Sequence, residues 1–182
     1  SALLKPECEA VAIGPLSLVV SLALYESLSG VLGTGADIRL KWPNDVLVND
    51  QKIAGILLET DVDDHGRVNW VALGVGVNIA VAPLERSIAL GDCLNTVSAN
   101  NFRDMFLDHL GRLYRQWLCD GFDARLREDW LSKTYKQGQA ISVKIGNTLV
   151  NGAFHDIDTH GHLRLKEASG VLKTISAGEV FV

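Results

Sequence analysis

Two lysines and a carboxylate lie close together in one short stretch of the chain. The segment Lys41–Asp45 reads KWPND, and Lys52 follows shortly after it. A lysine ammonium can bind phosphate as a point charge, and a carboxylate can hold a metal ion or accept a hydrogen bond. Asn44 adds an amide between them. These residue types permit a site for a small charged ligand, and they equally permit a surface ion pair of little energetic value.

The spacing of these residues predicts which of them share a face. If Asn49-Asp50 forms a two-residue hairpin loop, Leu47 pairs with Lys52 and Asp45 pairs with Ala54. Asp45 and Lys52 then point to the same side of the ladder, about 7 Å apart at ~3.4 Å per residue. Both side chains are therefore within reach of one small ligand, and the spacing alone does not favour such a site over a surface ion pair.

A predicted strand at Val68–Val81 has two very different faces. Its odd positions are almost all branched aliphatics, whereas its even positions include Gly74 and Gly76 and reach the polar Asn78. Glycine weakens the interior of a strand, so two of them on one face indicate that something approaches the backbone closely. A bound ligand and a tightly packed second backbone remain equal alternatives.

The elements around these residues predict an α+β fold. Apolar periodicity indicates a buried helix at Leu16–Leu28, a long helix capped by Asn100 or Asn101, and a shorter one at Phe122–Trp130. Further strands are expected at Ile38–Trp42, Val46–Val48 and Lys52–Glu59. After Gly138, turn pairs separate five short β-prone runs, which predicts a small closed barrel.

Composition excludes several classes of protein. The chain has 182 residues, 47% of them apolar and 21% charged, and a net charge of −5 without any basic run. It therefore has enough apolar surface for a core and disfavours nucleic acid as a partner. The apolar run Val11–Tyr25 is too short and too broken for a membrane span. Cys8, Cys93 and Cys119 are too widely spaced for a disulfide framework or a zinc site, which indicates reduced thiols in a cytoplasmic protein.

The last part of the chain offers two weaker alternatives. The predicted barrel carries four cations and four anions, so it lacks the positive charge that drives binding to nucleic acid. One of its turns gathers several metal-ligand residue types, but their spacing is not that of a tetrahedral site, and a solvated hairpin is favoured. These residues are His155, Asp156, Asp158, His160 and His162.

Three blocks of sequence closely resemble the biotin–protein ligase family in their order and spacing: Lys41–Val46, Gln51–Glu59 and Gly74–Ile79. The resemblance covers essentially the whole chain. It implies a class II synthetase-like core, a mixed sheet with helices, at residues 1–136, and a small SH3-like β-barrel at residues 137–182. Lipoate or octanoyl ligases of the same superfamily are the nearest alternative, and the KWPND block favours biotin.

The resemblance also implies an activity. Family members activate biotin with ATP and Mg²⁺ to biotinyl-5′-AMP and transfer biotin to a lysine of the biotin carboxyl carrier domain of acetyl-CoA carboxylase. They can form homodimers. By position, Lys52 matches the lysine that contacts biotin and the acyl-adenylate, and Lys41 matches the one that faces the phosphates. Asn44 and Asp45 match the pair associated with nucleotide and metal, and the pocket lining is matched by Gly55, Gly74 and Asn78.

The chain departs from the family pattern in one respect. The family's Arg- and Gly-rich loop and an earlier Ser/Thr-Asn segment would both precede Ser1. We therefore expect the given chain to be the later part of a ligase and to be inactive alone. A binding or regulatory module without catalysis is the alternative from a different class.

Overall fold

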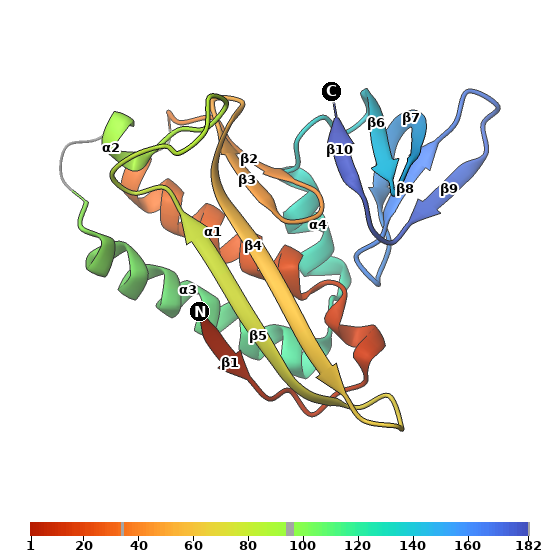
Figure 1. Ribbon diagram of the computed structural model, residues 1–182, viewed down its shortest axis with the longest axis horizontal. Coiled ribbons are helices and arrows are strands. Elements are labelled where there is room, and N and C mark those ends of the chain that lie inside the picture. The colour runs from red at the N-terminus through yellow and green to blue at the C-terminus, as the bar shows by residue number, and fades with distance from the viewer. Residues whose placement is uncertain (34, 94–96, 182) are drawn as a thin grey trace.

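The structure is a computed structural model that describes residues 1–33, 35–93 and 97–181. It contains two five-stranded sheets, and every pair of neighbouring strands in both is antiparallel. The first sheet has the order β1-β5-β4-β3-β2 (Figure 1). Its strands are β1 (Ala2–Leu4), β2 (Ile38–Lys41), β3 (Asp45–Val48), β4 (Gln51–Val62) and β5 (Val68–Val77).

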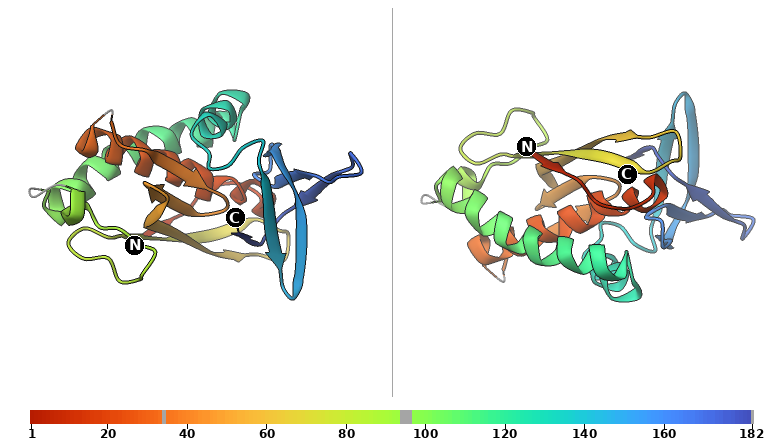
Figure 2. Two further views of the ribbon diagram at one scale, coloured as in Figure 1. Left: turned by 90° about the horizontal axis from the view of Figure 1, so that it is seen from above. Right: turned by 90° about the horizontal axis from the view of Figure 1, so that it is seen from below.

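Helices cover one face of the first sheet. Figure 2 shows α1 (Leu16–Leu32) and α3 (Ala99–Asp120) side by side on that face. The short helices η1 (Ala10–Ile13) and α2 (Leu90–Cys93) precede them, and α4 (Ala124–Ser132) follows α3. In the described part of the chain no helix lies across the opposite face.

The helix α1 is the centre of the core. By length and composition alone, the helical stretch Ala10–Leu32 could cross a membrane, but 67% of its most apolar window is buried inside the structure. Such burial is typical of the core helix of a globular domain. The helix runs beyond the expected Leu28 to Leu32, because the cap is Gly33 and not Gly30: the Gly33 N–H donates to the carbonyl of Ser29, and its φ is +78°.

Several predicted boundaries need correction. The cap of α3 is Ser98, whose hydroxyl accepts a hydrogen bond from the backbone N–H of Asn101, so neither Asn100 nor Asn101 is the cap. The strand β5 ends at Val77 and not at Val81. The hairpin loop Asn49-Asp50 is confirmed: both residues have positive φ, as a two-residue turn of the primed type requires.

The second sheet contains the five strands expected after Gly138, in the order β10-β6-β7-β8-β9. Within the described residues its edge strands β9 and β10 are not paired with each other, so the barrel is curved and SH3-like without the closure that was predicted. Val182 lies outside the described residues. The strands are β6 (Ala140–Ile145), β7 (Thr148–Ile157), β8 (Leu163–Lys166), β9 (Leu172–Ile175) and β10 (Glu179–Phe181).

The link between the two sheets runs along the outer edge of β2. The N–H of Leu40 donates to the carbonyl of Lys133, and the N–H of Tyr135 donates back to Leu40. The isolated parallel bridge between Leu40 and Thr134 lies here, and a second one joins Lys52 to Ser87. The α+β class is therefore confirmed, whereas the expected mixed sheet is an antiparallel one with isolated parallel bridges at its margins.

Candidate active site

Three residues of the expected site, together with Gly76, lie in one row across the first sheet. Lys41 of β2 pairs with Asp45 of β3, Asp45 pairs with Gly55 of β4, and Gly55 pairs with Gly76 of β5. Directly opposed residues in an antiparallel ladder point to the same face. The row therefore sets a cation and a carboxylate beside two positions without side chains, on the sheet face that carries no helix.

The register around Lys52 differs from the prediction in one place. Leu47 pairs with Lys52 as expected, but Asp45 opposes Gly55 and not Ala54, because a β-bulge shifts the register between them. An extra residue on one strand kinks the backbone and re-aims the neighbouring side chains. In this register the Lys52 ammonium lies 2.5 Å from the Asp45 carboxylate.

Gly55 makes room for the lysine. A Cβ at this position would lie 3.1 Å from both Cε and Nζ of Lys52 and 3.5 Å from the carboxylate of Asp45. The aliphatic end of Lys52 thus lies directly over bare backbone. The Lys52 side chain keeps 44% of its surface exposed, so its ammonium can still meet a second anionic group.

Two hollows adjoin along this face. The first hollow, of about 470 Å³, is floored by glycine positions of β4 and β5 and lined by Ser1, Asn44, Lys52, Gly55, Ile56, Leu57, Gly74, Val75 and Gly76. The second hollow, of about 340 Å³, shares Lys52, Gly55 and Gly76 with the first and is closed by Pro83, Leu84 and Ser87. Lys52 therefore lies where the two hollows meet. Among the described residues, a Cβ at Gly74 or Gly76 would meet only atoms of the neighbouring strand β4, at 3.6 Å or more, which favours the ligand floor over a second packed backbone.

Asn78 and Asn44 use their amides to hold the walls of these hollows. The Asn78 side chain donates to the backbone carbonyls of Lys52, at 3.3 Å, and of Ile88, at 3.1 Å. The Asn44 side chain donates to the carbonyl of Ile56 at 2.7 Å, and the Ile56 N–H donates back to Asn44 at 2.9 Å. Both asparagines line a hollow and also fix the backbone around it.

The segment after Asn78 was not singled out from the sequence, although it forms one wall of the second hollow. The hydroxyl of Ser87 accepts from the N–H of Leu84 and donates to its carbonyl, which closes a tight turn. The N–H of Lys52 donates to the carbonyl of Arg86, and the N–H of Ile88 donates to the carbonyl of Lys52. Pro83, followed by Ser87 a few residues later, is the sequence pattern that could have predicted this turn.

The donor set speaks against a resident metal. Among the described residues, no group of three or more His, Cys, Asp or Glu side chains could hold an ion. Asp45 is the one carboxylate among the site residues expected from the sequence, and it pairs with Lys52. Magnesium is commonly held by one or two carboxylates together with substrate phosphates. The residues therefore fit an ion that arrives with a nucleotide. Lys41 lines neither hollow.

The histidine-rich turn of the second sheet is structural. One carboxylate oxygen of Asp158 accepts from the backbone N–H groups of His160 and His162, each at 2.9 Å. Burial alone would raise the pKa of Asp156, but the hydrogen bond and charge of Arg164, together with the charge of Arg127, hold it below its ordinary value. Both carboxylates are thus engaged within the fold, which agrees with the interpretation as a hairpin.

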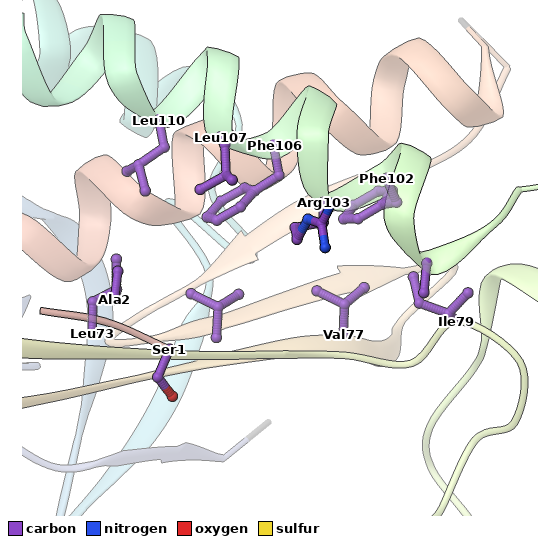
Figure 3. Close-up of a pocket in the computed structure, with 12 residues that line it drawn as sticks. Ser1, Ala2, Leu73, Val77, Ile79, Phe102, Arg103, Phe106, Leu107 and Leu110 are labelled. Carbon is purple, nitrogen blue, oxygen red and sulfur yellow. The ribbon is translucent and has the colours of Figure 1, made fainter.

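An apolar cavity of about 310 Å³ lies on the opposite side of β5, between this strand and α3 (Figure 3). The odd positions of β5 face it, as the alternation predicted, with Leu73 buried and Val77 partly buried. Phe102, Phe106 and Leu110 of α3 form the other wall. None of the expected site residues lines this cavity. The two faces of β5 therefore serve packing and the candidate site separately.

Family comparisons agree with this geometry. The chain matches the Biotin/lipoate A/B protein ligase family at residues 3–78 and the Biotin protein ligase C terminal domain at residues 137–182. A biotin–acetyl-CoA-carboxylase ligase of Paracoccus denitrificans is 36% identical over 98% of this chain and 77% of its own length. The chain therefore belongs to the biotin protein ligase family.

More distant relatives share the same fold. The bifunctional ligase/repressor BirA of Escherichia coli is 30% identical over 94% of this chain, which spans 53% of that relative. The apo biotin protein ligase of Aquifex aeolicus superimposes with a TM-score of 0.77 at 20% identity, covering 91% of this chain and 73% of its own. A biotin protein ligase-like protein of unknown function from Silicibacter gives a TM-score of 0.82 at 14% identity, over 96% and 76%.

Proposed function

We propose that the protein is an ATP-dependent biotin–acetyl-CoA-carboxylase ligase. The observation that carries the proposal is the glycine-floored pair of hollows, which meet at Lys52. The family membership supports it, as does the name of the Paracoccus relative, a biotin–acetyl-CoA-carboxylase ligase. A solved Aquifex aeolicus ligase is described in complex with biotin and ATP.

The arrangement suits the two steps of this reaction. In the first, a biotin carboxylate oxygen attacks the α-phosphorus of ATP, the bond to the β-phosphate bridging oxygen breaks, and pyrophosphate leaves. The Lys52 ammonium lies where both hollows meet, so it offsets negative charge on the reacting carboxylate and phosphate. Asp45 holds that ammonium in place through the ion pair. Lys41 lies on the same face outside both hollows, where it would meet phosphates that extend beyond them. Mg²⁺ bound to ATP and held by Asp45 would supply further positive charge at these phosphates.

The hollows divide the ligand between them. In this proposal the first hollow takes biotin, because Gly55, Gly74 and Gly76 let its rings approach the strand backbone. The second hollow takes the adenylate base against Pro83 and Leu84, with Asn78 at its side. In the second step, the amine of a carrier-domain lysine attacks the acyl carbon, an amide bond forms, and AMP leaves.

The proposal includes the surroundings of the reaction. The partner is the biotin carboxyl carrier domain, the location is the cytoplasm, and the ligase works as a homodimer. Residues 1–136 form the catalytic domain and residues 137–182 the second domain. The odd count of cysteines, all unpaired in the described structure, supports a reducing compartment.

The direct test is a mass-spectrometric assay of biotinyl-5′-AMP with the protein produced from its complete reading frame. With biotin, ATP and Mg²⁺ we expect adenylate in solution and, after addition of a carrier domain, one biotin per acceptor. Lipoic and octanoic acid are supplied in parallel as competitors. Preferential use of either acid would favour the lipoate-ligase alternative. Absence of adenylate with all three acids would contradict the proposal and favour a binding module.

A further inference from the structure

A single buried hydrogen bond joins the KWPND segment to the second sheet. The Trp42 side chain is only 3% exposed, and its indole N–H donates to the backbone carbonyl of Gly161 at 2.9 Å. Gly161 belongs to the turn between β7 and β8, 119 positions further along the chain. The bond therefore ties a segment of the candidate site to a part of the fold that contributes no residue to either hollow.

This turn is packed against the start of α1 with no space between the backbones. A Cβ at Gly161, whose φ is +76°, would lie 3.0 Å from the Cα of Pro15. A Cβ at Gly14 would lie 2.7 Å from the carbonyl oxygen of His160. A Cβ at Gly14 would therefore force the backbones apart, and a Cβ at Gly161 would be in tight contact with Pro15. The position of the Gly161 carbonyl is thus fixed by the first turn of α1.

The turn is braced from two further directions. Asp158 accepts hydrogen bonds from two backbone N–H groups inside the turn. Arg127 of α4 donates to the carbonyl of Ile157 and pairs with Asp156 at 2.9 Å. Since α4 also packs on α1, the turn is held by the same helices that support the first sheet.

From Trp42 the restraint passes along the segment to the catalytic lysine. The Ser17 hydroxyl of α1 donates to the carbonyl of Pro43 at 3.2 Å. Asn44 is bonded to β4 through its side chain and backbone, and Asp45 pairs with Lys52. Each residue from Trp42 to Asp45 therefore has at least one anchor, and the anchor of Trp42 comes from the second sheet.

We propose that Trp42 and Gly161 are positioning residues for adenylate formation. The β7–β8 turn holds the indole, the indole holds the segment, and the segment keeps Asp45 against Lys52. This inference rests on the proposed function, and it assigns the second sheet a direct mechanical part in the first chemical step. Neither residue lines a hollow, so substituting either one should move the Lys52 ammonium without removing the hollows.

The first test compares two buried tryptophans, each of which loses one indole hydrogen bond when it is replaced by phenylalanine. Trp42→Phe removes the N–H that Gly161 accepts and keeps an aromatic ring. Trp130→Phe removes an equivalent bond of 2.9 Å, from a side chain only 1% exposed to the Ser21 hydroxyl, away from the site. We expect kcat for biotinyl-AMP formation to fall about tenfold or more in Trp42→Phe, because a misplacement near 1 Å can cost about a hundredfold. The KM for biotin stays within about threefold, and Trp130→Phe retains its kcat at a comparable loss of Tm.

The second test compares two glycines with the same backbone conformation. Gly161→Ala forces a Cβ into Pro15, whereas Gly170→Ala places it in open space, although φ is positive at both. We expect Gly161→Ala to lower kcat like Trp42→Phe, and Gly170→Ala to lose only stability. Equal kcat in wild type and Trp42→Phe, or an equal fall in Trp130→Phe at matched Tm, would overturn the inference.

A readout without chemistry separates this inference from the proposed function. Amide hydrogen exchange of a peptide covering 42–46 is measured by mass spectrometry in all four variants and the wild type. We expect faster exchange there in Trp42→Phe and Gly161→Ala and unchanged exchange in the two controls. If the wild type makes no adenylate but exchange changes as expected, the proposed function is wrong, whereas the positioning of the segment by the Trp42–Gly161 hydrogen bond is confirmed. If exchange is unchanged in Trp42→Phe, the hydrogen bond from Trp42 to Gly161 does not position the segment, whether or not the protein makes adenylate.

Discussion

The Lys52 ammonium and the Asp45 carboxylate form an ion pair at 2.5 Å, directly above the bare backbone of Gly55. Both side chains are partly exposed, and such pairs contribute about 0–1 kcal/mol to stability. The value of this pair lies in geometry. It fixes a long, flexible side chain at the meeting point of two hollows before any ligand is present.

Lys52→Ala separates chemistry from folding. The substitution removes a side chain that is 44% exposed, so we expect the free energy of unfolding to change by less than about 1 kcal/mol. The rate of biotinyl-AMP formation should fall by about a hundredfold or more, because the preorganised charge at the reacting carboxylate is lost. Lys144→Ala, an exposed lysine of β6, is the matched control. Near-normal adenylate formation by Lys52→Ala would remove the residue from the mechanism.

Gly76→Val should move stability and binding in opposite directions. A Cβ at Gly76 meets only the carbonyl of Gly55 at 4.0 Å, so the fold has room for it. Valine in a strand gains up to about 1 kcal/mol over glycine. The same side chain occupies the floor that both hollows share, and we expect biotin binding measured by calorimetry to be lost.

Gly111→Ala of α3 provides the comparison for Gly76→Val. Its Cβ would lie 3.7 Å from Arg115, in ordinary contact, and alanine stabilises a helix interior by about 0.5–1 kcal/mol over glycine. Tm should rise in both variants, with biotin affinity unchanged in Gly111→Ala. Retained affinity in Gly76→Val would show that the glycine face of β5 is not the ligand floor.

The parts of this site that local chemistry determines could be predicted from the sequence. Asn49-Asp50 closes a two-residue loop, and such a loop fixes the first pair of the hairpin, Val48 with Gln51, and the next one, Leu47 with Lys52. The bulge beyond that pair could not be placed, although Ile53 and Ala54, consecutive and both buried, break the alternation of a regular strand. That break was the available signal.

Long-range contacts follow no local pattern. The KWPND resemblance singled out Trp42 as part of a motif, but nothing near it in the sequence indicates that its indole would bond to Gly161. The same holds for the closure of the predicted barrel. Turn pairs predict how many strands form, whereas pairing of β9 with β10 depends on curvature accumulated over the whole sheet.

Asn78→Asp should weaken the hydrogen bond that holds the backbone carbonyl of Lys52. The amide nitrogen of Asn78 donates to the carbonyls of Lys52 and Ile88, and a carboxylate has no proton for either. We expect a loss of about 1–3 kcal/mol in the free energy of unfolding, measured in urea, because two carbonyls lose their donor. Adenylate formation should fall as well.

Asn69→Asp is the matched control for Asn78→Asp on the same strand. Asn69 is exposed, and its amide bonds only to the side chain of Asp61 at 2.9 Å. The new carboxylate would also repel Asp61, but both groups are exposed to solvent, so we expect a loss of no more than about 1 kcal/mol. If Asn78→Asp were as mild as Asn69→Asp, its amide would not be holding the wall of the second hollow.

Asp156→Asn should destabilise the protein in a manner that depends on pH. Burial alone would raise the pKa of Asp156, but Arg164 and Arg127 hold it below its ordinary value. Because folding lowers this pKa, the contribution to stability is complete above the unfolded pKa of about 3.9 and is lost as the pH falls through the folded value. We expect Asp156→Asn to cost about 1–3 kcal/mol at pH 7, because charge-assisted hydrogen bonds to two arginines are weakened. The difference from the wild type should shrink in urea titrations carried down towards pH 3.

Asp104→Asn, which breaks an exposed pair with Arg103, should show no such loss at any pH. A difference between Asp156→Asn and wild type that stays constant from pH 7 to acid would contradict the assignment of this carboxylate as the charged anchor between α4 and β7.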